Sequence, residues 1–120
     1  MGKRDKLNAR VEALEAELLE RLIPALATAA DGKNDLVFLS SRVRPNSYPD
    51  SVRSSEADEL SDLSETLVGL YEQLGIPSTG TPAARYLVAS SDCYDHSNHH
   101  RAAPQGFAAR LLAELRAIGA

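Results

Sequence analysis

Residues 56–74, EADELSDLSETLVGLYEQL, carry the pattern that decides the fold class. Their leucines recur at alternating spacings of three and four residues, which is the period of one face of an α-helix. Ser55 begins a sequence that approximates a capping box, and Gly75 followed by Ile76 and Pro77 is typical of a helix end. The pattern therefore predicts a helix over 56–74 that buries one leucine face: Leu60, Leu63, Leu67, Leu70 and Leu74.

The N-terminal region carries a longer helical pattern. From Lys6 to about Ala30, apolar residues fall at helical spacing, which predicts a long amphipathic helix. Pro24 lies inside it, and because proline removes a backbone donor, we expect a kink near residues 20–23 or a break into two helices. Gly32 is expected to end the helix in a left-handed conformation. Residues 1–5 are predicted to form a flexible basic N-terminus.

Two more helices are predicted in the C-terminal half of the chain. Thr81 and Pro82 supply an N-cap and a first-turn proline for a helix that extends to about His96. A last helix is expected from about Pro104 to a stop at Gly119, with its apolar residues on one face.

The region between the first two long helices has two parts. Leu36–Val43 is too short for its period to separate a buried strand from a buried helix, and we favour a short helix capped by Asn34 or Asp35. Residues 44–55, RPNSYPDSVRSS, are rich in Pro and Ser and predict a surface loop. The whole chain, 1–120, is then predicted to be a single all-α domain, an irregular four- to five-helix bundle.

The composition agrees with a helical domain and excludes several classes of protein. Leu and Ala dominate the 43% apolar fraction, whereas aromatic residues make up 5% of the chain. The net charge of −4 has the wrong sign for a surface that neutralises phosphates, so direct nucleic-acid binding is not expected. A single cysteine, Cys93, indicates a reducing compartment, and no apolar leader or membrane-spanning stretch occurs. We therefore expect a cytoplasmic protein with no membrane partner.

Acidic residues are concentrated in the same stretch that decides the fold. Between Ser54 and Ala84 there are six acids and no Lys or Arg, so this segment carries −6 and the rest of the chain +2. A solvated helix face explains such a segment, and acids also suit the first turn of a helix. The alternative is a docking surface for a protein partner with a basic surface. The candidate partner-binding residues are the acids on one stripe, turned away from the leucines: Asp58, Asp62, Glu65 and Glu72.

The only cysteine and all three histidines lie within residues 92–100, DCYDHSNHH. If the helix persists, Cys93, His96 and His100 share one face and are ligand types suited to zinc. The segment has no second cysteine pair and no HExxH motif, so the alternative is a buried apolar cysteine followed by histidines near a frayed helix end. We expect no cofactor, with zinc as the alternative.

The predicted N-terminal helix contains a short pattern typical of coiled coils, which raises the question of dimerisation. Four of its apolar residues follow the spacing of a coiled-coil seam for less than two heptads: Leu7, Val11, Leu14 and Leu18. We expect this seam to pack within the chain, with a homodimer seam as the alternative, so the protein is predicted to be a monomer or a homodimer. The basic residues near it, from Lys3 to Arg10, have no interleaved aromatic residues for base stacking and are expected to be solvated.

The sequence contains no recognisable catalytic motif. No phosphate-binding glycine loop, GxSxG, HExxH or paired CxxC motif occurs, so we predict no catalytic residue and no enzyme. The leading hypothesis is a non-catalytic helical protein–protein interaction module that acts through its acidic face. Its most concrete form is a small regulator or inhibitor of a nucleic-acid-handling complex, and the Ala-, Leu- and Arg-rich composition resembles that of bacterial or phage proteins. The alternative is a zinc-type metal-binding protein that uses Cys93, His96 and His100.

Overall fold

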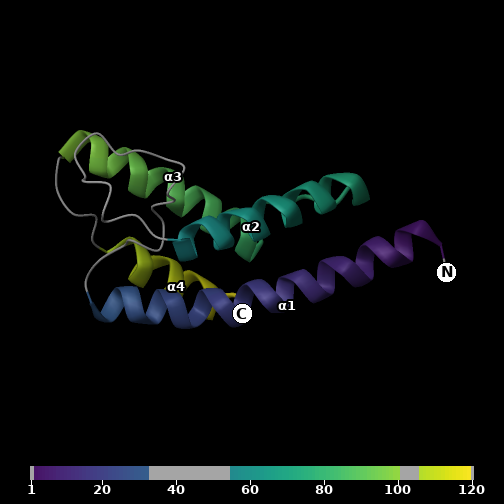
Figure 1. Cartoon of the computed structure of the whole chain (residues 1–120), viewed down its shortest axis with the longest axis horizontal. Coiled ribbons are helices and arrows are strands. Elements are labelled where there is room, and N and C mark those ends of the chain that lie inside the picture. Colours follow the sequence, from purple (N-terminus) through teal and green to yellow (C-terminus); the bar gives the residue numbers. More distant parts are fainter. Residues whose placement is uncertain (1, 33–54, 101–105, 120) are drawn as a thin grey trace.

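The computed structural model describes residues 2–32, 55–100 and 106–119. In these ranges the chain forms four helices and no strand (Figure 1). The predicted all-α bundle with a long N-terminal helix is therefore confirmed. The helices are α1 (Lys3–Asp31), α2 (Ser55–Leu74), α3 (Pro82–His100) and α4 (Phe107–Ala117).

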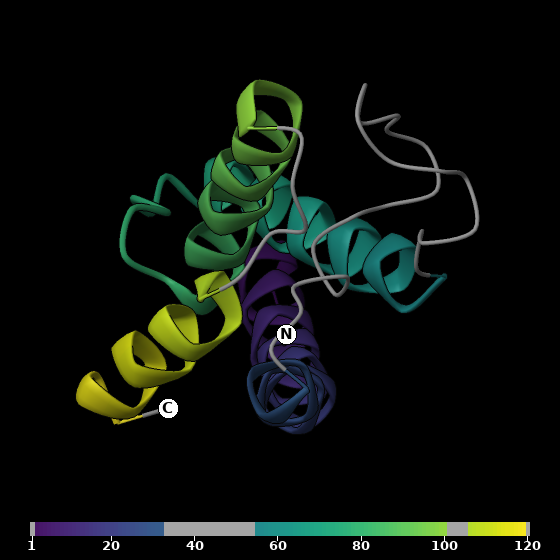
Figure 2. The same cartoon turned by 90° about the vertical axis from the view of Figure 1, so that its left-hand side faces the viewer.

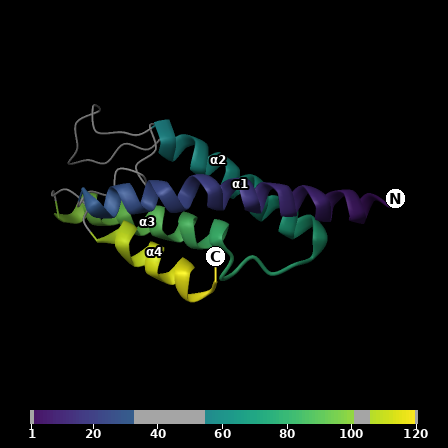
Figure 3. The same ribbon diagram turned by 90° about the horizontal axis from the view of Figure 1, so that it is seen from below.

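The long helix α1 is the axis of the bundle. Both α2 and α4 pack along α1, and α3 packs mainly on α2. The chain runs along α2 in the direction opposite to α1, and α3 and α4 lie beside the C-terminal half of α1 (Figures 1 and 3). The N-terminal half of α1 consequently depends on α2 for its packing.

Most of the core consists of leucines contributed by α1, α2 and α4, and α3 adds Ala83, Tyr86 and Cys93. In α1 the fully buried side chains are Leu18, Leu22 and Leu26, which recur every four residues and so lie on one face. The predicted leucine face of α2 is confirmed, with Leu63 only half-buried and the other four leucines buried. Each fully buried leucine stabilises the fold by about 1.5–3 kcal/mol relative to an exposed one. The buried leucines of α1 and α2 form one core cluster with Leu111 and Leu115 of α4.

The ends of α2 and α3 follow their sequence signals. Gly75 has a φ of +69°, and its N–H donates to the Glu72 carbonyl while the Ile76 N–H donates to the Tyr71 carbonyl, the two bonds of a Schellman motif. At the start of α3, Thr81 Oγ1 accepts a hydrogen bond of 3.3 Å from the Ala84 N–H, as an N-cap does. These contacts fix the turn between the two helices.

Several predicted boundaries differ from the observed ones. α1 begins at Lys3, so residues 3–5 belong to the helix and not to a preceding tail, and it passes through Pro24 as one helix without a break. The prediction of a left-handed Gly32 was wrong, because Gly32 has a φ of −76° and its N–H donates to the Thr28 carbonyl. α3 extends to His100, and α4 begins after Gly106.

Other predictions fall outside the part of the chain that the structure describes. They are the ambiguous run at residues 36–43 and the loop predicted at 44–55, of which only Ser55 is described, as the first residue of α2. Among the described helices, none is both long enough and apolar enough to cross a membrane.

Candidate interaction surface

The acidic stripe of α2 lies on the side opposite its buried leucines. Asp62, Glu65 and Glu72 are exposed, and Asp58 is half-buried. Residues spaced by three, four or seven positions share a helix face, which is why one helix separates these acids from its leucines so completely. The four predicted partner-binding residues therefore do lie together on one face, called here the acidic face.

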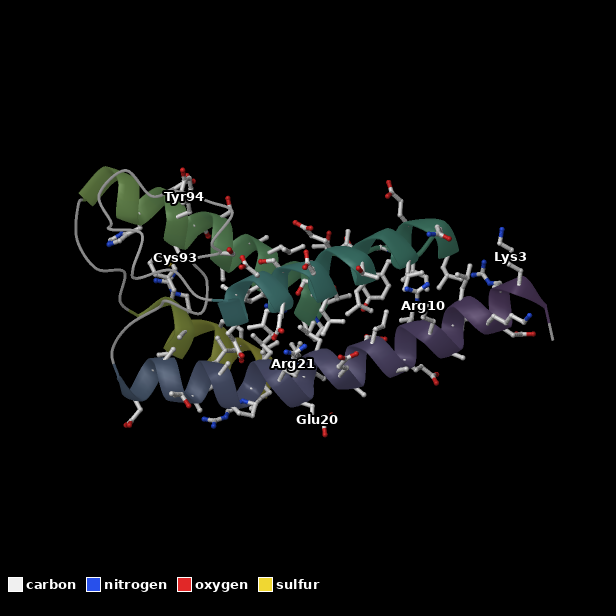
Figure 4. All side chains as sticks on the ribbon, in the orientation of Figure 1. Lys3, Arg10, Glu20, Arg21, Cys93 and Tyr94 are labelled. Carbon is white, nitrogen blue, oxygen red and sulfur yellow. The ribbon has the colours of Figure 1, made fainter. Side chains whose placement is uncertain are left out.

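Basic residues of α1 reach only the edge of this face. Arg21 points from α1 toward α2 and forms an ion pair with Glu59, whereas Glu20 points away (Figure 4). Because both partners are largely exposed, this ion pair contributes at most about 1 kcal/mol. Arg10 also points toward α2 and lines a shallow groove together with Asp62. The acidic face is thus bordered by positive charge along α1.

Gly69 lies in the middle of the acidic face and was not anticipated as a functional residue. It is inside α2, and a Cβ added there would meet nothing within 4 Å. A glycine inside a helix destabilises it by about 0.5–1 kcal/mol relative to alanine. Since a Cβ at Gly69 would lie in open space, no packing constraint from the described residues explains this glycine. A missing side chain at this point lets another backbone approach the helix closely. Its helical spacing from Glu65 and Glu72 was the available sequence signal.

Two buried tyrosines on α2 and α3 belong to the packing and not to an exposed site. The Tyr86 hydroxyl donates a 3.4 Å hydrogen bond to the Ala57 carbonyl. Burial raises the pKa of both phenols, and the Glu15 carboxylate adds to the increase in the pKa of Tyr71. The Tyr71 hydroxyl and the Ser64 hydroxyl are buried without a hydrogen-bond partner among the described residues. Both phenols are therefore neutral at physiological pH, and the Tyr86 hydrogen bond joins α3 to α2.

The three candidate zinc ligands have different surroundings. The Cys93 side chain is fully buried within the core cluster. The His96 ring lies 5.5 Å from the Phe107 ring in an edge-to-face arrangement, which joins α3 to α4. The side chain of His100 is outside the described residues. Among the described side chains, no three His, Cys, Asp or Glu groups are placed to hold a metal ion.

The candidate dimer seam lies along the contact between α1 and α2. Val11 and Leu18 are buried by other residues of the same chain, and Leu7 and Leu14 are half-buried and packed against the core. The structure therefore shows intramolecular packing for this seam.

A cleft between α3 and α4 was not anticipated from the sequence. It has a volume of about 520 Å³, within the range of known binding sites, and Figure 2 shows that α3 and α4 are inclined to each other. Its apolar part includes Ala84, Val88 and Leu111, and the Val88 side chain is 61% exposed. The cleft depends on the angle between two helices, for which the sequence holds no local signal.

Charged residues of both signs border this cleft. Arg85 of α3 donates a 2.8 Å hydrogen bond from Nε to the Gly80 carbonyl and lies 3.6 Å from Glu114 of α4. Arg110 of α4 lies over the Phe107 ring, 5.3 Å from its centroid. Asp92 of α3 lines the opposite wall. The rim therefore has two positive and two negative side chains.

Comparisons with known proteins found no match: no family model, no curated protein and no solved structure is similar to this chain.

Proposed function

We propose that this protein is a non-catalytic helical interaction module that binds a basic surface of a partner protein through the acidic face of α2. The observation that supports the proposal most directly is the exposure of Asp62, Glu65 and Glu72 on a helix that contains no Lys or Arg. Such a face attracts a positively charged surface and speeds its encounter with the module.

Gly69 adds a second argument for contact at this face. Its open position among the acids costs helix stability and has no packing explanation within the described residues. A partner backbone that lies against α2 at this point would benefit from the missing side chain. A partner that normally binds nucleic acid has the required basic surface, so a regulator or inhibitor of a nucleic-acid-handling complex is the concrete form of the proposal.

The test compares two triple variants with the same net charge. The face variant carries Asp62→Lys, Glu65→Lys and Glu72→Lys. The control variant carries Glu12→Lys, Glu20→Lys and Asp95→Lys, three exposed positions outside α2. Each set of changes moves the net charge from −4 to +2. Circular dichroism checks that both variants keep their helicity.

The probe is a fluorescein-labelled peptide of Lys and Arg residues, and binding is measured by fluorescence anisotropy at low ionic strength. We expect the face variant to bind at least tenfold more weakly than the control, and added salt to weaken binding of the wild-type protein. Equal losses in the two variants would show that bulk charge governs binding and would contradict the proposal. Capture from a native lysate with the wild type and the face variant then identifies the partner.

A further inference from the structure

We propose that the α3–α4 cleft is a homodimer interface, in which a second copy of the chain docks its own α3–α4 cleft about a two-fold axis that runs along the cleft. This inference concerns a different surface from the acidic face and goes beyond the proposed function. No residue of α2 is among the described residues that line the cleft.

Exposed apolar side chains lie on or next to the elements that form the cleft. Among the described residues, three large hydrophobic side chains are exposed: Val88 at 61%, Ile118 at 47% and Ile76 at 40%. Val88 lines the cleft, Ile118 follows the last residue of α4, and Ile76 lies in the connection between α2 and α3. Of the three, Val88 lies in the cleft itself and gives it exposed apolar area that a partner can cover.

Charged side chains of opposite sign face each other across the cleft. Two contacts set the register of α3 against α4, namely Arg85 with Glu114 and His96 with Phe107. Because these contacts pair the two helices in opposite directions, we infer that Arg110 of α4 lies across the cleft from the turn of α3 that carries Asp92. Among the described residues, neither Arg110 nor Asp92 forms an ion pair. Within the described part of the chain, the cleft thus has one charge of each sign on opposite walls without an ion-pair partner.

With a two-fold axis along the cleft, the same Arg–Asp pair forms twice in the dimer. The axis places α3 of one chain against α4 of the other, because a two-fold interface brings the same patch of both chains together. Arg110 then faces the partner's Asp92, and Asp92 faces the partner's Arg110. Val88 of each chain is covered at the centre. A neutral rim around an apolar centre suits a second copy of the same surface better than a strongly charged partner.

The size of the interface predicts its strength. α4 has 11 residues and is therefore roughly 16 Å long, so the surfaces that meet are small. Interfaces at the low end of the usual size range are weak and transient. We therefore expect a weak, reversible monomer–dimer equilibrium.

Sedimentation equilibrium of the full chain at several concentrations tests the interface. Val88→Glu should weaken dimerisation at least tenfold, since it places a carboxylate in the apolar centre, and the exposure of Val88 keeps the fold intact. Arg110→Glu and Asp92→Arg should each weaken self-association. Their matched controls, Arg116→Glu and Asp95→Arg, change the same charges at exposed positions on α4 and α3 that are not among the residues lining the cleft, and should not weaken it.

A mixing experiment separates this geometry from any other dimer. The Arg110→Glu chain has an acidic rim and the Asp92→Arg chain a basic rim, so an equimolar mixture should form heterodimers more tightly than either variant forms homodimers. A wild type that is monomeric at several hundred micromolar would overturn the proposal. A dimer that persists in the Val88→Glu variant would also overturn the proposal. If Leu7→Glu then abolished that dimer, the interface would be the α1 seam instead.

Discussion

The same substitution, Gly to Ala, is expected to have opposite effects at two positions, one inside α2 and one directly after its end. Gly69 has helical backbone angles inside α2, and Gly75 has a φ of +69° just after its end. At both positions a new Cβ would meet nothing within 4 Å. The new methyl group therefore causes no steric conflict at either position. The expected difference between the two variants comes only from the backbone conformation.

The magnitudes follow from the backbone alone. Gly69→Ala should raise the free energy of unfolding by about 0.5–1 kcal/mol, because alanine restricts the unfolded chain and exposes less helix backbone. At Gly75 the left-handed conformation costs an L-residue about 1–2 kcal/mol, offset by about 0.4–1 kcal/mol from the restricted unfolded chain. Gly75→Ala should therefore lower the free energy of unfolding by about 1 kcal/mol.

Urea denaturation followed by circular dichroism measures both effects, with thermal melting as a second probe. We expect the order of stability to be Gly69→Ala, then the wild type, then Gly75→Ala, with melting temperatures separated by about 2–8 °C per step. A stabilising Gly75→Ala would refute the left-handed assignment. A destabilising Gly69→Ala would show that the acidic face is packed against another part of the chain, which would also remove the proposed surface.

Two further predictions concern buried side chains. Burial raises the pKa of Tyr71 and Tyr86 above the ordinary value of 10.0, so the folded state holds both phenolic protons more tightly than the unfolded chain. The free energy of unfolding should therefore be unaffected by these groups well below pH 10 and should decline as the pH rises above 10. Urea denaturation at pH 8 and 10.5 should show a smaller decline in Tyr71→Phe than in the wild type. A free energy of unfolding that does not change between these pH values would contradict this. The buried Cys93 thiol should react with a disulfide reagent far more slowly in the native state than in urea, and zinc should bind no tighter than millimolar; stoichiometric micromolar binding that Cys93→Ser abolishes would establish the metal site instead.

The helices were predictable where the determining interactions are local. The leucine spacing of α2, the Gly75 end and the Thr81 cap each depend on residues within one or two turns, and each prediction is confirmed. Pro24 shows the limit of local rules, since α1 continues through it. Buried leucines on both sides of Pro24, at positions 22 and 26, are packed in the core and hold the helix as one element.

The acidic face and the cleft differ in how the sequence encodes them. Helical periodicity places Asp62, Glu65 and Glu72 opposite the leucines as soon as α2 is recognised, so this face was predictable before any tertiary contact was known. The cleft requires that α4 leave α3 at an angle and that Arg85 and Glu114 set its register. Those are contacts between residues about thirty positions apart, and no spacing within α3 or α4 indicates them.

The two proposed surfaces can act together because they belong to different helices. A dimer joined at the α3–α4 cleft leaves the acidic face of α2 unused in each chain, so it presents two such faces to a partner. A partner with two basic patches would then be held by a second, intramolecular contact, which raises its apparent affinity without any new interaction. Val88→Glu should therefore reduce binding to a tandem basic probe while leaving binding to a single basic peptide unchanged. The face variant should lose both and still dimerise.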